Sequence, residues 1–111
     1  MAKTEIKLKE LVVGNDITPT TYKMACADGD YPAGTIVEFD STTKKLKKAT
    51  AAANMFGIVA DDSKATATDN KIVVYVTGRF DFKECIYPTV EGETILDYQV
   101  RGKDIGIFFA E

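Results

Sequence analysis

Hydrophobic residues gather in several short runs along the chain, and in some of them they alternate with polar residues, as is typical of strands that bury one face. These runs occupy residues 4–13, 35–39, 57–60, 71–77 and 105–111. Clusters of Gly, Pro, Asn, Asp and Thr separate the runs, and these residue types favour turns. The pattern therefore predicts a chain of short β-strands joined by polar turns.

Local signals refine this pattern. The polar stretch "DSTTKK" lies between two apolar runs and predicts a hairpin over residues 35–50. The strand at 71–77 is compatible with an extension as far as Phe82, before Pro88 ends the passage. Ala-rich residues in "TAAANMFG" allow a helical turn, and residues 91–99 allow one short helix. The expected fold is a mainly β (β-rich α+β) single domain with one or two short helices.

The run at residues 4–13 is set apart from the rest of the chain. Ile6 and Leu8 fall on one side of this strand and lysines on the other, and "GNDITPTTY" follows as a flexible joint. This form predicts an extended N-terminal arm (residues 1–15) ahead of a β-rich domain (residues 16–111). Such an arm can add a strand to the sheet of another chain. The alternative is that the segment pairs within its own domain as an ordinary first strand. The candidate contact residues of the arm are Ile6, Lys7, Leu8, Leu11 and Val12.

Composition narrows the class of protein. The chain has 111 residues, enough for one domain with a single core. Hydrophobic residues make up 45% and charged residues 28%, the balance of a folded globular protein. The net charge of −3 gives no basic surface, so direct binding to nucleic acid is not expected. No run approaches the ~20 apolar residues of a membrane helix, and the N-terminus lacks the apolar stretch of a signal peptide. We therefore expect a protein of a soluble compartment, without Sec export and without a membrane partner.

Four lysines gather in the predicted hairpin, at Lys44, Lys45, Lys47 and Lys48. One interpretation is a patch that binds a polyanion. The other is a hairpin edge on which lysines block unwanted pairing with further strands, and the pattern favours this second interpretation.

The chain contains no histidine, which removes imidazole from catalysis and from metal ligation. The densest cluster of ionisable groups is the loop at residues 61–70, but the adjacent Asp61 and Asp62 point to opposite sides and cannot converge on one substrate. Neither this loop nor "DGDYPAG" has the ligand spacing of a calcium site, and the sequence contains no phosphate-binding motif. Both segments are predicted to be solvated turns. The sequence thus predicts no catalytic residue, no cofactor and no metal.

The two cysteines, Cys26 and Cys85, show no C-x-x-C spacing. A disulfide between them stays open at this point, but a two-cysteine chain without a signal peptide usually keeps its thiols reduced. We expect both thiols to be packed as small hydrophobic groups.

The features between Ala33 and Pro88 follow a particular order. A strand and a polar turn end in Lys-Leu, and an Ala-rich spacer leads to Gly-Ile-Val. A Thr/Asp-rich loop then precedes a strand with an aromatic residue, a Gly-x-Phe and an aromatic-Pro pair. The residues are Lys45-Leu46, Gly57-Ile58-Val59, Tyr75, Gly78-Arg79-Phe80 and Tyr87-Pro88. In this order, and in total length, the chain resembles the head decoration proteins of tailed bacteriophages, the family of the lambda capsid-stabilising protein D.

The resemblance implies a β-clip type fold, a homotrimer, and neither a reaction nor a cofactor. It implies a place on the exterior of the phage head, after synthesis in the cytoplasm of the bacterial host. There, trimers would clamp neighbouring copies of the major capsid protein against internal DNA pressure, and the N-terminal arm would contact that protein.

Two alternatives stay open. One is another virion structural module, such as part of a tail or fibre. The other is a β-clip trimer that binds a small ligand or hydrolyses nucleotides, since fold alone does not fix function. The hydrolase would need a catalytic Asp in a Gly-containing motif and phosphate-binding groups. The chain has only two arginines, Arg79 and Arg101, and no such motif.

Overall fold

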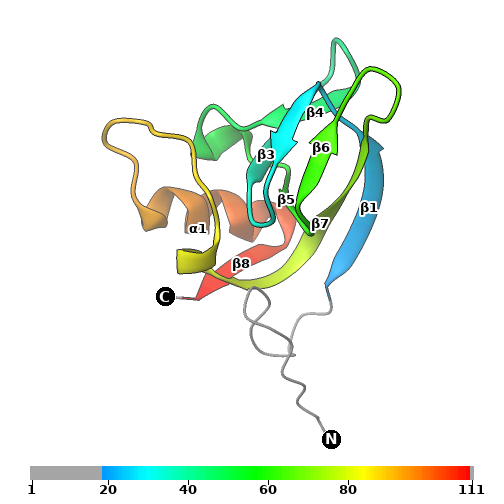
Figure 1. Cartoon of the computed structure of the whole chain (residues 1–111). Helices are drawn as coiled ribbons and strands as arrows, with labels where there is room; N and C mark the ends of the chain where they lie inside the picture. Colours follow the sequence, from blue (N-terminus) through cyan, green and yellow to red (C-terminus); the bar gives the residue numbers. More distant parts are fainter. Residues whose placement is uncertain (1–18, 111) are drawn as a thin grey trace, which may run out of the picture.

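The longest strand, β7 (Lys71–Asp81), is the central strand of the fold because it pairs with three others. The structure is a computed structural model, and it describes residues 19–110 (Figure 1). β1 (Thr20–Ala25) runs antiparallel along one side of β7, and β5 (Gly57–Val59) runs antiparallel along the other. β8 (Ile107–Ala110) pairs in parallel with the last four residues of β7.

The hairpin predicted from the sequence is confirmed. It consists of β3 (Ile36–Asp40) and β4 (Lys45–Lys48), which extend the sheet in the order β1-β7-β5-β3-β4. The sheet curls until its two ends meet. The Ala27 N–H, just after β1, donates a hydrogen bond to the Leu46 carbonyl of β4 at 2.7 Å. Strands make up 46% and helices 18% of the described residues, so the prediction of a mainly β single domain is confirmed.

A second, two-stranded sheet corrects part of the sequence interpretation. β2 (Gly29–Tyr31) pairs antiparallel with β6 (Ser63–Ala65), whereas both segments were predicted to be turns. These strands have only three residues each, and their Gly, Asp and Lys residues give no apolar alternation to detect. Only Tyr31 and Ala65 point inward and are buried. Apart from the half-buried Ser63 and Asn70, the rest of the loop is exposed, as expected, and it is closed by a hydrogen bond from the Asp69 N–H to the Thr66 hydroxyl at 3.1 Å.

The single α-helix of residues 19–110, α1 (Ile95–Ile105), begins and ends later than predicted. Thr94 caps its first turn: its hydroxyl accepts from the Leu96 N–H at 3.3 Å, and its own N–H donates to Asp97 Oδ2 at 2.7 Å. The helix ends at Gly106, whose φ of 86° is left-handed. The last strand therefore starts two residues after Ile105. Within residues 19–110, no helix is long and apolar enough to cross a membrane.

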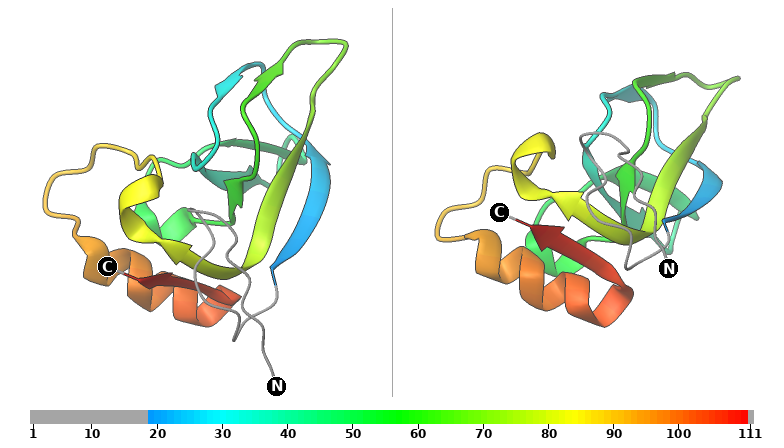
Figure 2. Two further views of the ribbon diagram at one scale, coloured as in Figure 1. Left: turned by 60° about the horizontal axis from the view of Figure 1, so that its bottom comes forward. Right: turned by 90° about the horizontal axis from the view of Figure 1, so that it is seen from below.

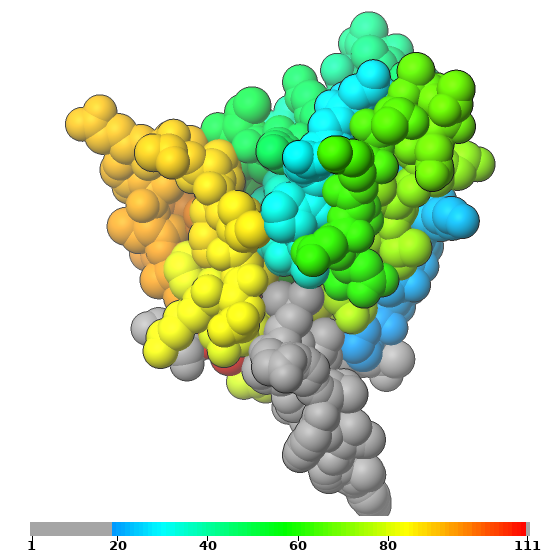
Figure 3. Space-filling view, viewed as in Figure 1, coloured from blue at the N-terminus to red at the C-terminus, as the bar shows by residue number. Residues whose placement is uncertain are grey.

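Two short 3₁₀ helices complete the elements. η1 (Ala52–Asn54) confirms the helical turn expected in the Ala-rich stretch. η2 (Phe82–Glu84) follows β7, so the predicted extension of that strand holds as far as Asp81, which caps η2 by accepting from the Lys83 N–H at 3.0 Å. After η2 the chain lies beside the segment that leads into β3, where the Ile86 N–H donates to the Gly34 carbonyl at 2.8 Å (Figure 3).

Both faces of the central strands are buried, one on the side of α1 and the other inside the curled sheet, and alternate residues point to opposite sides. Ile36 and Ile58 face the side on which α1 lies, and Val37 and Val59 face the inside of the curled sheet. We call these two layers the helix-side core and the sheet-interior core. The helix-side core contains Ile36, Ala49, Ala52, Met55, Ile58, Phe80, Cys85, Tyr98, Ile107 and Phe109. The sheet-interior core contains Cys26, Tyr31, Val37, Leu46, Val59, Ala65, Ile72 and Val74.

Candidate functional site

The predicted contact residues of the arm, Ile6, Lys7, Leu8, Leu11 and Val12, lie outside the described residues, as does the proposed boundary between arm and domain. The described residues show where the chain enters the domain. β1 starts at Thr20, opposite Thr77 of β7, and the register shifts between Thr20 and Thr21. The predicted joint thus already belongs to a strand from Thr20 onward, because Thr and Tyr favour extended backbone. The described part of the chain therefore enters the domain at the start of β1, beside β7.

Partly exposed apolar side chains surround one margin of the sheet-interior core. Met24, Phe56 and Val76 are half-buried against that core. Phe39 is 36% exposed, and its ring centroid lies 5.7 Å from that of Phe56. Tyr22, two residues after the start of β1, is 54% exposed. We call these five residues the apolar rim; they offer an apolar surface close to the start of β1.

The sequence interpretation missed the apolar rim. Tyr22 was assigned to the joint, although "TTYKMA" places Tyr22 and Met24 at alternate positions after Pro19. This period-two pattern was the available signal. The position of Phe56 carried no such signal, because it precedes a strand of only three residues.

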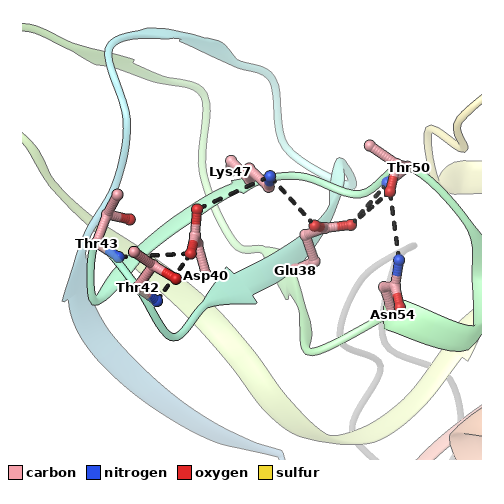
Figure 4. Close-up of polar contacts among 7 residues, drawn as sticks. All are labelled: Glu38, Asp40, Thr42, Thr43, Lys47, Thr50 and Asn54. Carbon is pink, nitrogen blue, oxygen red and sulfur yellow. Dashed lines mark hydrogen bonds and ion pairs between the residues drawn. The ribbon is translucent and has the colours of Figure 1, made fainter.

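A polar cluster on the outer face of the β3–β4 hairpin bears on whether the four lysines form a positive patch (Figure 4). Lys47 Nζ lies 3.6 Å from Glu38 Oε2 and 3.9 Å from Asp40 Oδ2, so two carboxylates offset its charge. Lys48 points elsewhere, with Nζ 6.0 Å from the centre of the Tyr31 ring. The four lysines therefore do not form one positive patch. Lys45, Lys47 and Lys48 lie on β4, the outermost strand of the order, and this position favours edge protection, although Ala27 already covers part of that edge.

The carboxylates of this cluster are held ionised. Burial opposes the charge of Glu38, but hydrogen bonds from the Thr50 N–H and hydroxyl, both at 2.9 Å, and the nearby Lys47 outweigh it and lower the pKa. Hydrogen bonds from the N–H groups of Thr42 and Thr43 lower the pKa of Asp40.

A pH prediction follows from these two groups. A carboxyl whose pKa is lower in the folded than in the unfolded protein stabilises the fold above the unfolded value, and this stabilisation disappears as pH falls through the folded value. We expect Glu38→Gln to lower the urea midpoint at neutral pH, and the difference from wild type to shrink below about pH 4. Glu91→Gln, which removes an exposed carboxylate, is the control. An equal difference at all pH values would contradict this account.

Oxygen atoms of the acidic loop at residues 61–70 accept hydrogen bonds that hold the loop and the segment before β3 in place. Asp62 Oδ1 accepts from the Ala33 N–H at 2.8 Å, tying the loop to the segment before β3. The Asp61 carbonyl accepts from the Ser63 hydroxyl at 2.8 Å, which turns the chain into β6. Across residues 19–110, no group of three or more His, Cys, Asp or Glu side chains could hold a metal ion.

Both cysteines are free and buried, as the sequence predicted. Burial raises the pKa of Cys26, and it raises the pKa of Cys85 to about 12, so neither thiol ionises at neutral pH. Burial also raises the pKa of Tyr87 and of Tyr98. The Tyr87 hydroxyl donates to the Phe82 carbonyl at 2.6 Å, so this group too serves the fold.

Comparisons with known proteins add no family. No family model matches the chain, and no curated protein matches it. Its function is therefore inferred from its own residues and their arrangement.

Proposed function

We propose that the protein is a capsid decoration (cement) protein of a tailed bacteriophage. As a homotrimer it binds the outer surface of the expanded head, through the major capsid protein, and stabilises the head against internal DNA pressure. The observation that carries this proposal is the order of features between Ala33 and Pro88. These features lie on consecutive elements of the chain: the β3–β4 hairpin, η1, β5, β6, β7 and η2.

The roles of the polar side chains support a structural task. Four carboxylates hold the backbone together: Glu38 binds Thr50, Asp62 binds Ala33, Asp81 caps η2, and Glu93 Oε2 accepts from the Ala52 N–H at 2.9 Å. A general acid or base needs a group free to exchange a proton with a substrate. Here each of these groups is committed to a backbone donor.

Attachment to the head is proposed to depend on the arm and on avidity. Three arms on one rigid trimer make the second and third contacts intramolecular, so the trimer binds far more tightly than one arm alone. The apolar rim lies beside the point where the arm is attached and offers the body of the domain a further contact with the capsid protein.

The hydrolase alternative is the weaker one. Of the two arginines, Arg101 donates from Nε to the Met55 carbonyl at 3.0 Å and so ties α1 to the end of η1. A phosphate-binding arginine would need its donors directed to the ligand. The tail or fibre alternative differs from decoration in its partner alone, so the binding experiment separates them.

Co-sedimentation with heads tests the proposal. The intact protein is mixed with empty expanded shells, and separately with unexpanded shells, both made from the major capsid protein encoded in the same phage or prophage. We expect the protein to sediment with expanded shells and to stay in the supernatant with unexpanded ones. Failure to bind expanded shells would overturn the proposal, and binding to tail or fibre fractions instead would support the alternative module.

A further inference from the structure

The outer edge of β1 has no partner strand among residues 19–110. β1 is the first strand of the sheet order, and within this part of the chain it pairs with β7 alone. The other end of the sheet reaches this edge only beyond β1, where Cys26 bridges to Leu46 and the Ala27 N–H donates to the Leu46 carbonyl. Figure 2 shows β1 at the margin of the sheet, outside β7. An open strand edge can pair with one further strand.

The backbone of β1 presents hydrogen-bonding groups to this open edge. The Cys26 N–H donates toward the β7 side, to the Asn70 carbonyl at 2.7 Å, whereas the next N–H, that of Ala27, points the opposite way, to Leu46. Backbone groups alternate in direction along a strand. The residues of β1 whose N–H and C=O groups point away from β7 are therefore Thr21, Lys23 and Ala25, which we call the edge residues.

The apolar rim borders the same edge. Tyr22 and Met24 alternate with the edge residues and face the inside of the curled sheet, next to Val74 and Ile72 of β7. The other rim residues continue this surface across β7, β3 and the turn before β5. A strand added to β1 would gain main-chain hydrogen bonds and would also cover apolar surface of the rim.

The chain itself contains a segment suited to this edge. In the run at residues 4–13, Ile6, Leu8 and Val12 share one face of an extended backbone. The stretch "GNDITP" between this run and β1 is rich in turn-forming residues, and two such runs joined by a turn stretch are the pattern of a hairpin. The described chain begins at residue 19, directly before the open edge, so the run needs only a reversal of the chain to reach it.

We propose that, in the free protein, residues 4–13 fold back antiparallel along the open edge of β1. Their backbone pairs with the edge residues, and the side that carries Ile6, Leu8 and Val12 packs on the apolar rim. A segment tethered this closely has an effective concentration of roughly millimolar, so it occupies the edge ahead of a strand from another chain. This docking does not depend on the decoration function, because it needs no partner.

Under the proposed function, the docking acts as a latch. The same apolar face cannot cover the rim and contact the capsid protein at once, so residues 4–13 leave β1 when they add to the sheet of the capsid protein. The apparent affinity for shells is then reduced by the fraction of copies in which the segment is released. Release also uncovers the apolar rim for contact with the shell. This step, unlike the docking, rests on the proposed function.

Amide hydrogen exchange of the full chain, measured for each residue by NMR, tests the docking. We expect the N–H groups of the edge residues to exchange at least about tenfold faster in a variant that lacks residues 2–14. The N–H groups of Tyr22 and Met24, which point to β7, are the internal control and should change much less. Equal exchange at the edge residues in the two proteins would overturn the docking. Protection that is lost on dilution would also overturn it, because the strand would then come from another copy.

Paired substitutions test which face of the segment covers the rim. Ile6→Ser/Leu8→Ser should release the segment and speed exchange at the edge residues as the deletion does. Lys7→Ser/Lys9→Ser, on the other side of the same run, is the matched control and should keep that exchange slow. Equal effects of the two pairs would overturn the assignment of this face to the rim.

Lys23→Pro tests the latch separately from the docking. Proline here removes an N–H that points to the open edge, so it blocks the added strand and leaves the hydrogen bonds between β1 and β7 in place. We expect this variant to bind expanded shells at least about threefold more tightly than wild type, because its segment is already released. Unchanged or weaker binding, with faster exchange at Thr21 and Ala25, would overturn the latch and leave the docking standing. Protected edge residues in a protein that does not sediment with shells would support the docking and overturn the decoration function.

Discussion

Replacing Gly102 by alanine should destabilise the domain by about 2–3 kcal/mol, although alanine is the better helix former. In an exposed helix the same change would stabilise by about 1 kcal/mol. Here a Cβ at Gly102 would lie 2.0 Å from the Ile107 carbonyl oxygen and 3.6 Å from the Met55 side chain. Overpacking in a buried site usually costs about 1–3 kcal/mol, and contact with backbone leaves no flexible side chain to move aside.

The geometry around Gly102 explains why this contact is so close. Gly106 reverses the chain directly after α1, and its N–H donates to the Gly102 carbonyl at 2.8 Å. β8 therefore starts immediately and runs back along the helix, with the Ile107 carbonyl above Gly102. Alanine would have to push β8 away from α1 or unwind the last turn, and Ile107 is fully buried in the helix-side core.

Urea unfolding at a fixed protein concentration measures the effect, because assembly makes apparent stability depend on concentration. We expect the midpoint to fall by about 1–2 M. Gly92→Ala is the control: its φ of 86° also penalises alanine, but nothing lies within 4 Å of the new Cβ, so only the backbone cost of about 1–2 kcal/mol should be seen. A Gly102→Ala variant as stable as wild type would show that α1 and β8 are not packed as described.

The parts of the fold that the sequence predicted are those with clear periodicity. The β3–β4 hairpin, β5 and β7 have apolar residues at strand spacing or as buried runs, and the structure places them there. The misplaced parts depend on other chemistry. α1 was shifted because its start is set by the Thr94 cap, and because Gly102, inside the helix, looks like a helix breaker unless the crossing of β8 is known.

The candidate site was less accessible to sequence reasoning. Alternation of apolar and charged residues singles out a segment such as residues 4–13, but it does not identify the surface that receives it. The apolar rim combines residues from β1, β3, β7 and the turn before β5, which only the curled sheet brings to one margin. Leu96 and Val100 lie on a helix whose start was misplaced, so the sequence did not show that both side chains are exposed.

Deleting residues 2–14 should abolish binding to expanded shells while leaving the trimer intact. Under the proposed function each arm adds a strand to the capsid protein's sheet, with main-chain hydrogen bonds and alternate side chains contributing to affinity. If the loss of one arm contact costs about tenfold, the loss of all three costs up to ~10³-fold. Co-sedimentation measures the binding and light scattering the trimer. The competing interpretation, in which the arm stays the first strand of its own domain on the shell as well, instead predicts that the deletion variant binds shells normally.

Paired substitutions make the same test at side-chain resolution. A strand that buries one face needs its alternate residues, so Ile6→Ser/Leu8→Ser should lose shell binding, whereas Lys7→Ser/Lys9→Ser, which changes the outward side of the same segment, should retain most of it. Equal effects of the two pairs would argue against strand addition by the arm. Normal shell binding by the protein without residues 2–14 would remove the arm from the contact altogether, and the apolar rim, which includes Tyr22, would then be the surface to substitute next.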